Sequence, residues 1–94
     1  MLIDLNQPEY INEYHSLYRS YFEYHGYENI IFFMIQNHMT DSEEYQEYFN
    51  NYIAKVTDYE IDKSVLLNKV KENNPDIKFN NWEVLFEKDA IRLD

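Results

Sequence analysis

The chain has no cysteine, one glycine and two prolines among its 94 residues. Without cysteine it has no disulfide framework and no thiol nucleophile. A single glycine, Gly26, excludes the glycine-rich loops that bind phosphates and dinucleotides. The longest apolar run, Ile30 to Ile35, is far shorter than the roughly 20 residues of a transmembrane helix. The N-terminus lacks the basic start and apolar stretch of a signal peptide, so we expect a soluble, cytoplasmic protein.

Basic residues are scarce in the first half of the chain. Residues 1–54 contain nine acidic residues and one basic residue, Arg19, whereas residues 55–94 contain nine acidic and seven basic residues. All ten tyrosines lie within residues 1–59. An electrostatic field of one sign attracts oppositely charged partners and repels nucleic acids and anionic membranes. The net charge of −10 therefore predicts a basic protein partner, with no direct binding to nucleic acid or membrane.

Helical patterns dominate residues 6–73. Asn6 followed by Pro8 predicts the start of a first helix, and Gly26 predicts its end. The apolar positions of this helix cover an arc of about 160°, whereas one packing contact needs only about 100°. We therefore expect this helix to contact two neighbours or to leave part of its tyrosine-rich face in water.

Three more helices are predicted after Gly26. The segment Tyr27 to Met39 is apolar nearly all round and suits a short central helix, with a buried strand as the alternative. Thr40–Glu43 resembles a capping box and precedes an apolar stripe that ends at Val56. The pattern Thr57–Glu60 repeats the capping box and predicts a fourth helix, which Asn73, Asn74 and Pro75 end.

The C-terminal segment changes period and predicts short strands at Ile77–Phe79, Trp82–Phe86 and Ala90–Leu93. The alternative is a fifth helix capped by Asn80. We predict a mainly α fold in one domain, residues 1–94: a compact bundle of about four helices with a short C-terminal β-hairpin or meander, or else an all-α five-helix bundle. The acidic, tyrosine-rich helical part covers residues 6–56, and the fourth helix and strands cover 57–94. The predicted core comprises Tyr14, Leu17, Tyr21, Ile31, Phe33, Phe49, Ile53, Leu66 and Val70, with Trp82 and Phe86 closing the β element.

Signals for catalysis are weak. None of His15, His25 and His38 has another histidine at the i, i+4 spacing of helical zinc ligands. Two glutamate pairs, Glu9 with Glu13 and Glu43 with Glu47, lie opposite apolar stripes, where a solvated carboxylate has no raised pKa for acid–base work. We therefore predict no enzyme activity, no cofactor and no metal site.

The acidic half suggests a small protein-binding module. We expect an inhibitor, antagonist or immunity-type protein that occupies a basic surface of a nuclease, toxin or nucleic-acid-handling protein. Aromatic anchors would supply buried area while acids raise the association rate. The alternative is a structural or assembly subunit, either a homo-oligomer or a small component of a larger complex. The candidate partner-binding residues are Glu9, Glu13, Glu23, Tyr24, Glu43, Glu44, Glu47 and Tyr48.

Overall fold

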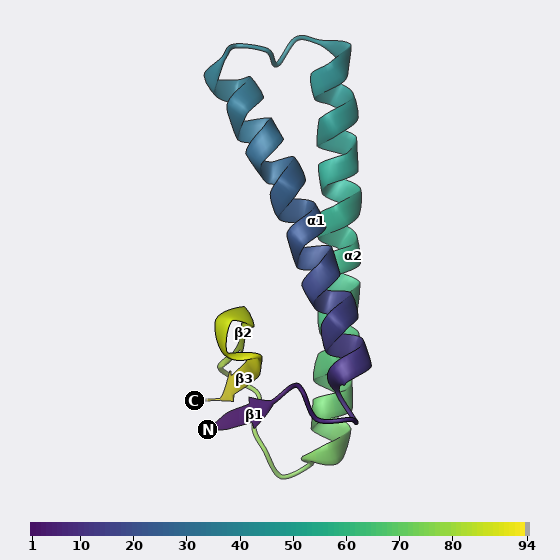
Figure 1. The fold of residues 1–94 in the computed structure, drawn as a ribbon, viewed down its shortest axis with the longest axis vertical. Coiled ribbons are helices and arrows are strands. Elements are labelled where there is room, and N and C mark those ends of the chain that lie inside the picture. Colours follow the sequence, from purple (N-terminus) through teal and green to yellow (C-terminus); the bar gives the residue numbers. More distant parts are fainter. Residues whose placement is uncertain (94) are drawn as a thin grey trace.

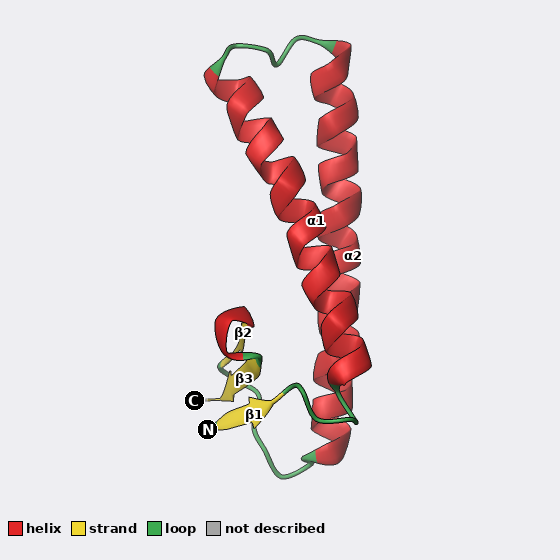
Figure 2. Ribbon diagram, viewed as in Figure 1, coloured by secondary structure: helices red, strands yellow, loops and turns green. Residues whose placement is uncertain are grey.

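The computed structural model describes residues 1–93 and contains two long helices that form a hairpin, with a small sheet beside one end (Figure 1). The helices, strands and short loops follow one another as coloured in Figure 2. The elements in chain order are β1 (Leu2–Asp4), α1 (Ile11–Gln36), α2 (Glu43–Asn73), β2 (Trp82–Leu85), the 3₁₀ helix η1 (Phe86–Lys88) and β3 (Ala90–Leu93). The predicted bundle of about four helices, and its five-helix alternative, are therefore wrong.

The first predicted helix does not stop at Gly26 and does not start near Asn6. Helix α1 begins at Ile11, and it continues through Gly26 because a single glycine inside a helix costs only about 0.5–1 kcal/mol. The helix ends beyond Gln36, where His38 adopts a left-handed φ of 56°. The amide of His38 donates to the Ile35 carbonyl, and the amide of Met39 donates to the Met34 carbonyl. These two bonds form a Schellman motif, with histidine in the position that glycine usually occupies.

The third and fourth predicted helices are one helix. Helix α2 begins at Glu43, where the Ser42 side chain accepts a 3.1 Å hydrogen bond from the Tyr45 amide. The second capping-box pattern lies inside this helix, and the Thr57 hydroxyl donates to the Ile53 carbonyl instead. A capping-box pattern marks a helix start only if its side chains must bond the first free amides. Inside a helix, the carbonyls of the preceding turn bond these amides instead, and the sequence alone does not distinguish the two cases. The predicted end is confirmed, because α2 stops at Asn73.

The sheet contains three antiparallel strands in the order β1-β3-β2. Strands β2 and β3 lie where the sequence predicted strands, and β1, which was not predicted, pairs with β3 so that Ile3 lies opposite Ile91. The predicted strand at Ile77–Phe79 does not form, although Ile77 and Phe79 pack against the core. The predicted fifth helix is also absent, because residues 82–85 are extended.

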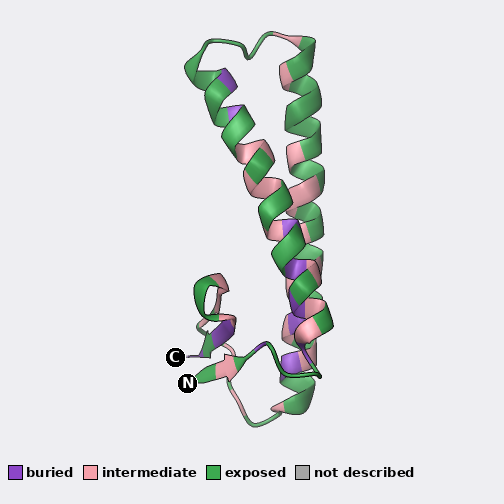
Figure 3. Cartoon of the chain, viewed as in Figure 1, coloured by how far each residue is buried: buried purple, intermediate pink, exposed green. Residues whose placement is uncertain are grey.

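The core lies at the sheet end of the hairpin, as the buried residues in Figure 3 show. Leu17, Leu66 and Val70 are fully buried as predicted, together with Leu5 and Ile91. Tyr14 and Ile31 are also buried, and Tyr21 is half-buried. Three other predicted core residues are exposed, namely Phe33 at 60%, Phe49 at 37% and Ile53 at 47%. They are exposed because each helix has only one neighbour at the far end of the hairpin, where the two helices diverge (Figure 1).

The molecule is elongated. Its Cα radius of gyration is 16.2 Å and its extents are 50 × 22 × 20 Å, whereas a compact chain of this length has a radius of gyration of about 12 Å. Its accessible surface of 6472 Å² exceeds the roughly 5,800 Å² expected for a compact monomer of this mass. Much of the apolar surface that a four-helix bundle would bury is therefore exposed on the two-helix hairpin.

Candidate protein-binding surface

One face of the hairpin carries the sheet. On this face the rings of Tyr14 and Tyr21 stack on Phe86, with centroids 6.3 Å and 4.0 Å apart. From α2, the Lys63 ammonium lies 5.0 Å from the ring centroid of Trp82. These contacts identify the side of each helix that points towards the sheet.

The same face continues beyond the sheet and is uncovered there. Phe32 follows Tyr14 by 18 residues and Tyr45 precedes Lys63 by 18 residues; five complete helical turns place each pair on one side of its helix. A hydrogen bond from the Tyr52 hydroxyl to Glu28 joins the helices on this side. We call this uncovered region the distal face, which comprises Phe32, Ile35, Tyr45, Phe49, Tyr52, Ile53 and Val56.

The distal face is apolar, and several of its side chains are well exposed. Phe32 is 55% exposed and Ile35 is 45% exposed, although helical spacing directs both towards the sheet side or towards α2. The Phe49 ring stacks on Tyr45 and is tilted against Tyr52, with ring centroids 6.0 Å and 6.4 Å apart. A connected, partly exposed aromatic row on α2 thus lies beside the apolar residues of α1.

The charges at the far end of the hairpin are mostly negative. Glu43, Glu44 and Glu47 are exposed at the start of α2, beside Asp41 in the loop. The sequence from residue 27 to residue 57 contains one lysine, Lys55, and no arginine. The Lys55 ammonium lies 3.0 Å from Glu23 on the neighbouring helix. The far end of the hairpin therefore combines exposed apolar side chains with unbalanced carboxylates.

Two predicted partner-binding acids have partners within the chain. The ammonium of Lys69 lies 2.6 Å from Glu13, and this hydrogen bond is the main cause that holds the pKa of Glu13 below its usual value. The other carboxylate oxygen of Glu13, Oε2, is buried without a hydrogen bond. Glu23 pairs with Lys55. An external partner would have to compete with a lysine at each position.

The remaining predicted residues lie in separate parts of the molecule. Glu9 is exposed before α1, at the sheet end, whereas Tyr48 lies near the start of α2 and is 37% exposed. Tyr24 is half-buried, and its ring centroid is 5.0 Å from that of Tyr59. Burial is the largest cause that raises the pKa of Tyr24, to about 12. Glu43, Glu44, Glu47 and Tyr48 thus form one group at the far end of the hairpin, where Glu43 and Glu47 lie on the side of α2 opposite the distal face. The others do not join this group.

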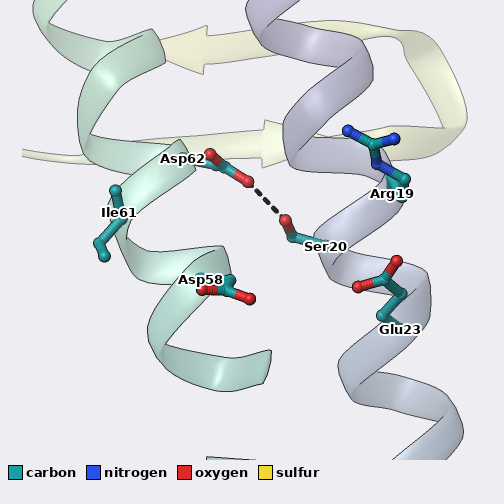
Figure 4. Close-up of a pocket in the computed structure, with 6 residues that line it drawn as sticks. All are labelled: Arg19, Ser20, Glu23, Asp58, Ile61 and Asp62. Atoms are coloured by element: carbon teal, nitrogen blue, oxygen red, sulfur yellow. Dashed lines mark hydrogen bonds between the residues drawn. The ribbon is translucent and has the colours of Figure 1, made fainter. Parts of the chain in front are cut away.

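An open depression of about 310 Å³ lies on the opposite side of the hairpin (Figure 4). The Ser20 hydroxyl donates a 2.5 Å hydrogen bond to Asp62 across the two helices. Glu23, Asp58, Arg19 and Ile61 complete the lining. The lining contains no histidine, and its carboxylates, including Asp62, are weak bases for a serine hydroxyl. The contact ties the two helices together.

The exposed apolar residues of the distal face were missed because a helical stripe predicts burial without naming the neighbour that covers it. One signal was present, since the apolar arc of the first helix was too wide for a single contact. That width is now explained, because α1 contacts α2 and the sheet over its first half and then loses the sheet.

Neither helix within residues 1–93 contains an apolar stretch of the length that a bilayer span requires. The same residues contain no group of three or more side chains suited to hold a metal ion. The two helices and the small sheet give no evidence for the expected inhibitor or immunity-type role. Searches for a matching protein family, a similar characterised protein and a similar solved structure found no match to this chain.

Proposed function

We propose that this chain is a non-catalytic protein-binding module whose distal face docks a basic amphipathic helix of another protein. The observation that carries the proposal is that the sheet covers only one half of an apolar hairpin face. The other half leaves Phe32, Ile35, Phe49 and Ile53 between 37% and 55% exposed. Contiguous exposed apolar patches are uncommon on monomeric proteins and mark interaction sites.

A helix fits the dimensions of this face. The α2 part runs from Tyr45 to Val56, about 18 Å at 1.5 Å per residue. A segment of about 12 residues would match it and place its apolar side on the aromatic row. This is the helix-in-groove mode, in which anchors at i, i+3, i+4 and i+7 meet the apolar face of the receptor.

The surrounding charges favour a basic segment. Glu43, Glu44 and Glu47 lie at the same end of the hairpin as the docking face, with Glu43 and Glu47 on the opposite side of α2, and the nearby lysine is paired with Glu23. The field of these carboxylates would attract Lys or Arg side chains of a docked helix without direct pairing. Complementary charge raises the association rate and adds specificity, and its effect decreases with salt. We expect this binding to take place in the cytoplasm, in agreement with the absence of cysteine.

The test is a titration with a fluorescein-labelled helical peptide of about 15 residues, with leucines on one side and lysines on the other. We expect micromolar binding that weakens at least tenfold between about 50 and 500 mM salt. The double variant F49S/I53S should weaken binding at least tenfold, because it removes two apolar anchors.

The matched control is I61S/V65S. These residues are on the same helix and are exposed at 57% and 50%, but they lie on the side that faces away from the sheet. This variant should bind as the unmodified chain does. Equal losses in both double variants would show that the peptide adheres to any exposed apolar surface, and the proposal would then fail. Equal binding of a peptide with glutamates in place of its lysines would refute the basic nature of the partner.

A further inference from the structure

A second exposed stripe runs along α1, on the side that faces away from α2. Its members are spaced by four, four, three and four residues, which places them on one side of a helix. All of them are exposed, with Phe22 at 55% and Phe33 at 60%. We call it the α1 outer face, and it comprises Tyr18, Phe22, Gly26, Asn29 and Phe33.

The α1 outer face carries no carboxylate, although the chain has 18 acidic residues. The three acids of α1 are all directed towards α2: Glu13 pairs with Lys69, Glu23 with Lys55, and Glu28 accepts from Tyr52. The ionisable side chains that flank the outer face are His15 and Arg19, both exposed. This side is therefore the part of α1 where two copies of an acidic chain can meet without opposing carboxylates.

Gly26 lies midway along this face, and neither its backbone conformation nor its surroundings within the chain require a glycine. Its φ is not positive, and a Cβ placed there would meet nothing within 4 Å. Glycine therefore lowers the stability of α1 relative to alanine, with no compensating contact within the chain. A missing side chain between Phe22 and Phe33 leaves a notch in which the backbone of a second helix can approach closely.

From these observations we infer that two copies of this chain associate through their α1 outer faces, with the helices antiparallel and crossing at Gly26. In this arrangement Phe22 of each copy faces Ile30 of the other, and the Phe33 ring lies near the opposite Arg19. Arginine over an aromatic ring is a favourable contact. The distal face lies on another side of the hairpin, so a dimer would leave both copies able to bind a basic helix.

The exposed area indicates a weak, reversible dimer. Tyr18, Phe22 and Phe33 are 38%, 55% and 60% exposed, which amounts to about 300 Å² per copy at roughly 200 Å² for each side chain. Two copies would bury about 600 Å² from these rings, and flanking side chains bring the total towards the roughly 1,200 Å² lower limit of standard interfaces. We therefore expect dissociation in the range of tens to hundreds of micromolar, on the order of that for transient complexes.

The test is sedimentation equilibrium of the unmodified chain between about 10 µM and 1 mM, a range that brackets the expected dissociation constant. The average mass should rise from 11.6 kDa towards twice that value. Association should be unchanged or stronger at high salt, because salt screens the repulsion between two chains of charge −10. Peptide binding at the distal face has the opposite salt dependence, so the two proposals can fail separately.

The variants G26A and G26E form a matched pair. Both replace glycine with a better helix former, so far-UV circular dichroism should show an intact fold in each. G26A should retain the dimer with at most a few-fold loss, whereas G26E places two carboxylates at the crossing point and should weaken the dimer at least tenfold. F33E should have a similar effect from a position that is 60% exposed, and G26E should bind the basic peptide normally. A chain that remains at 11.6 kDa up to 1 mM, or a dimer indifferent to both G26E and F33E, would overturn the inference.

Discussion

The single glycine of this chain is in a position that does not require it, and a position that favours glycine is occupied by histidine. Gly26 lies inside α1, whereas His38 adopts the left-handed conformation at the C-terminus of the same helix. The double variant G26A/H38G transfers the glycine to the helix end. We expect each change to stabilise the fold and their effects to add, because the sites are about 18 Å apart along the helix and share no contacts.

The magnitudes follow from backbone preferences. Alanine in place of glycine in an exposed helix interior contributes about 1 kcal/mol, and the space around Gly26 accepts the new methyl group. A left-handed conformation costs an L-residue roughly 1–2 kcal/mol, part of which is offset by the greater flexibility of glycine in the unfolded chain. H38G should therefore contribute about 0.5 kcal/mol. A total of about 1.5 kcal/mol corresponds to a rise in Tm of roughly 6–12 °C for a domain of this size.

The assay is thermal and urea unfolding followed by circular dichroism, with both single variants measured beside the double variant. A protein concentration near 5 µM lies well below the expected dimer dissociation constant, so association does not contribute. If G26A instead lowered Tm, Gly26 would have to end a helix in a left-handed conformation, as the sequence alone predicted. That result would refute the continuous helix α1 and, with it, the two-helix architecture.

Three further predictions concern the core, acid stability and the distal charges. L66A should lower the free energy of unfolding by about 2–5 kcal/mol and I53A by less than about 0.5 kcal/mol in urea titrations, because Leu66 is fully buried and Ile53 is 47% exposed; similar losses would place Ile53 in a core. A hydrogen bond from Tyr14 is the main cause that holds the pKa of Asp89 below its usual value, so its stabilising contribution is present above about pH 4 and is lost as the pH falls through the lower folded-state pKa. D89N, which also tolerates the left-handed φ of 49°, should flatten the dependence of the urea midpoint on pH between about 4 and 2, and an unchanged slope would contradict this assignment. The triple reversal E43K/E44K/E47K should abolish the loss of basic-peptide binding with salt, and a retained salt dependence would place the binding charges elsewhere.

Several elements of the fold could be predicted from local sequence. The end of α2 at Asn73 follows from two asparagines and a proline, and the strands β2 and β3 follow from the change of apolar period after residue 76. The buried residues Leu17, Leu66 and Val70 also follow from helical spacing. Each of these features depends on residues close together in the chain, where periodicity and turn chemistry are informative.

The number of helices could not be predicted in the same way. Gly26 and the Thr57–Glu60 pattern are compatible with a helix end and with a helix interior, and the difference in free energy is about 1 kcal/mol. Packing between α1 and α2, with cross-links such as Ser20 to Asp62, decides in favour of continuous helices. Strand β1 could not be predicted from local sequence either, because its three residues become a strand only by pairing with β3 at the other end of the chain.

The candidate surfaces also depend partly on the sequence and partly on the tertiary structure. The sequence by itself determined that the chain is acidic in its first half, rich in tyrosine, free of cysteine and short of glycine, and these properties favour a basic partner whatever the fold. Only the tertiary structure decided which apolar residues are covered. Phe49 and Leu66 both belong to apolar stripes whose helical spacing predicts burial. The sheet lies over one end of the hairpin and not the other, so Leu66 is in the core and Phe49 is exposed.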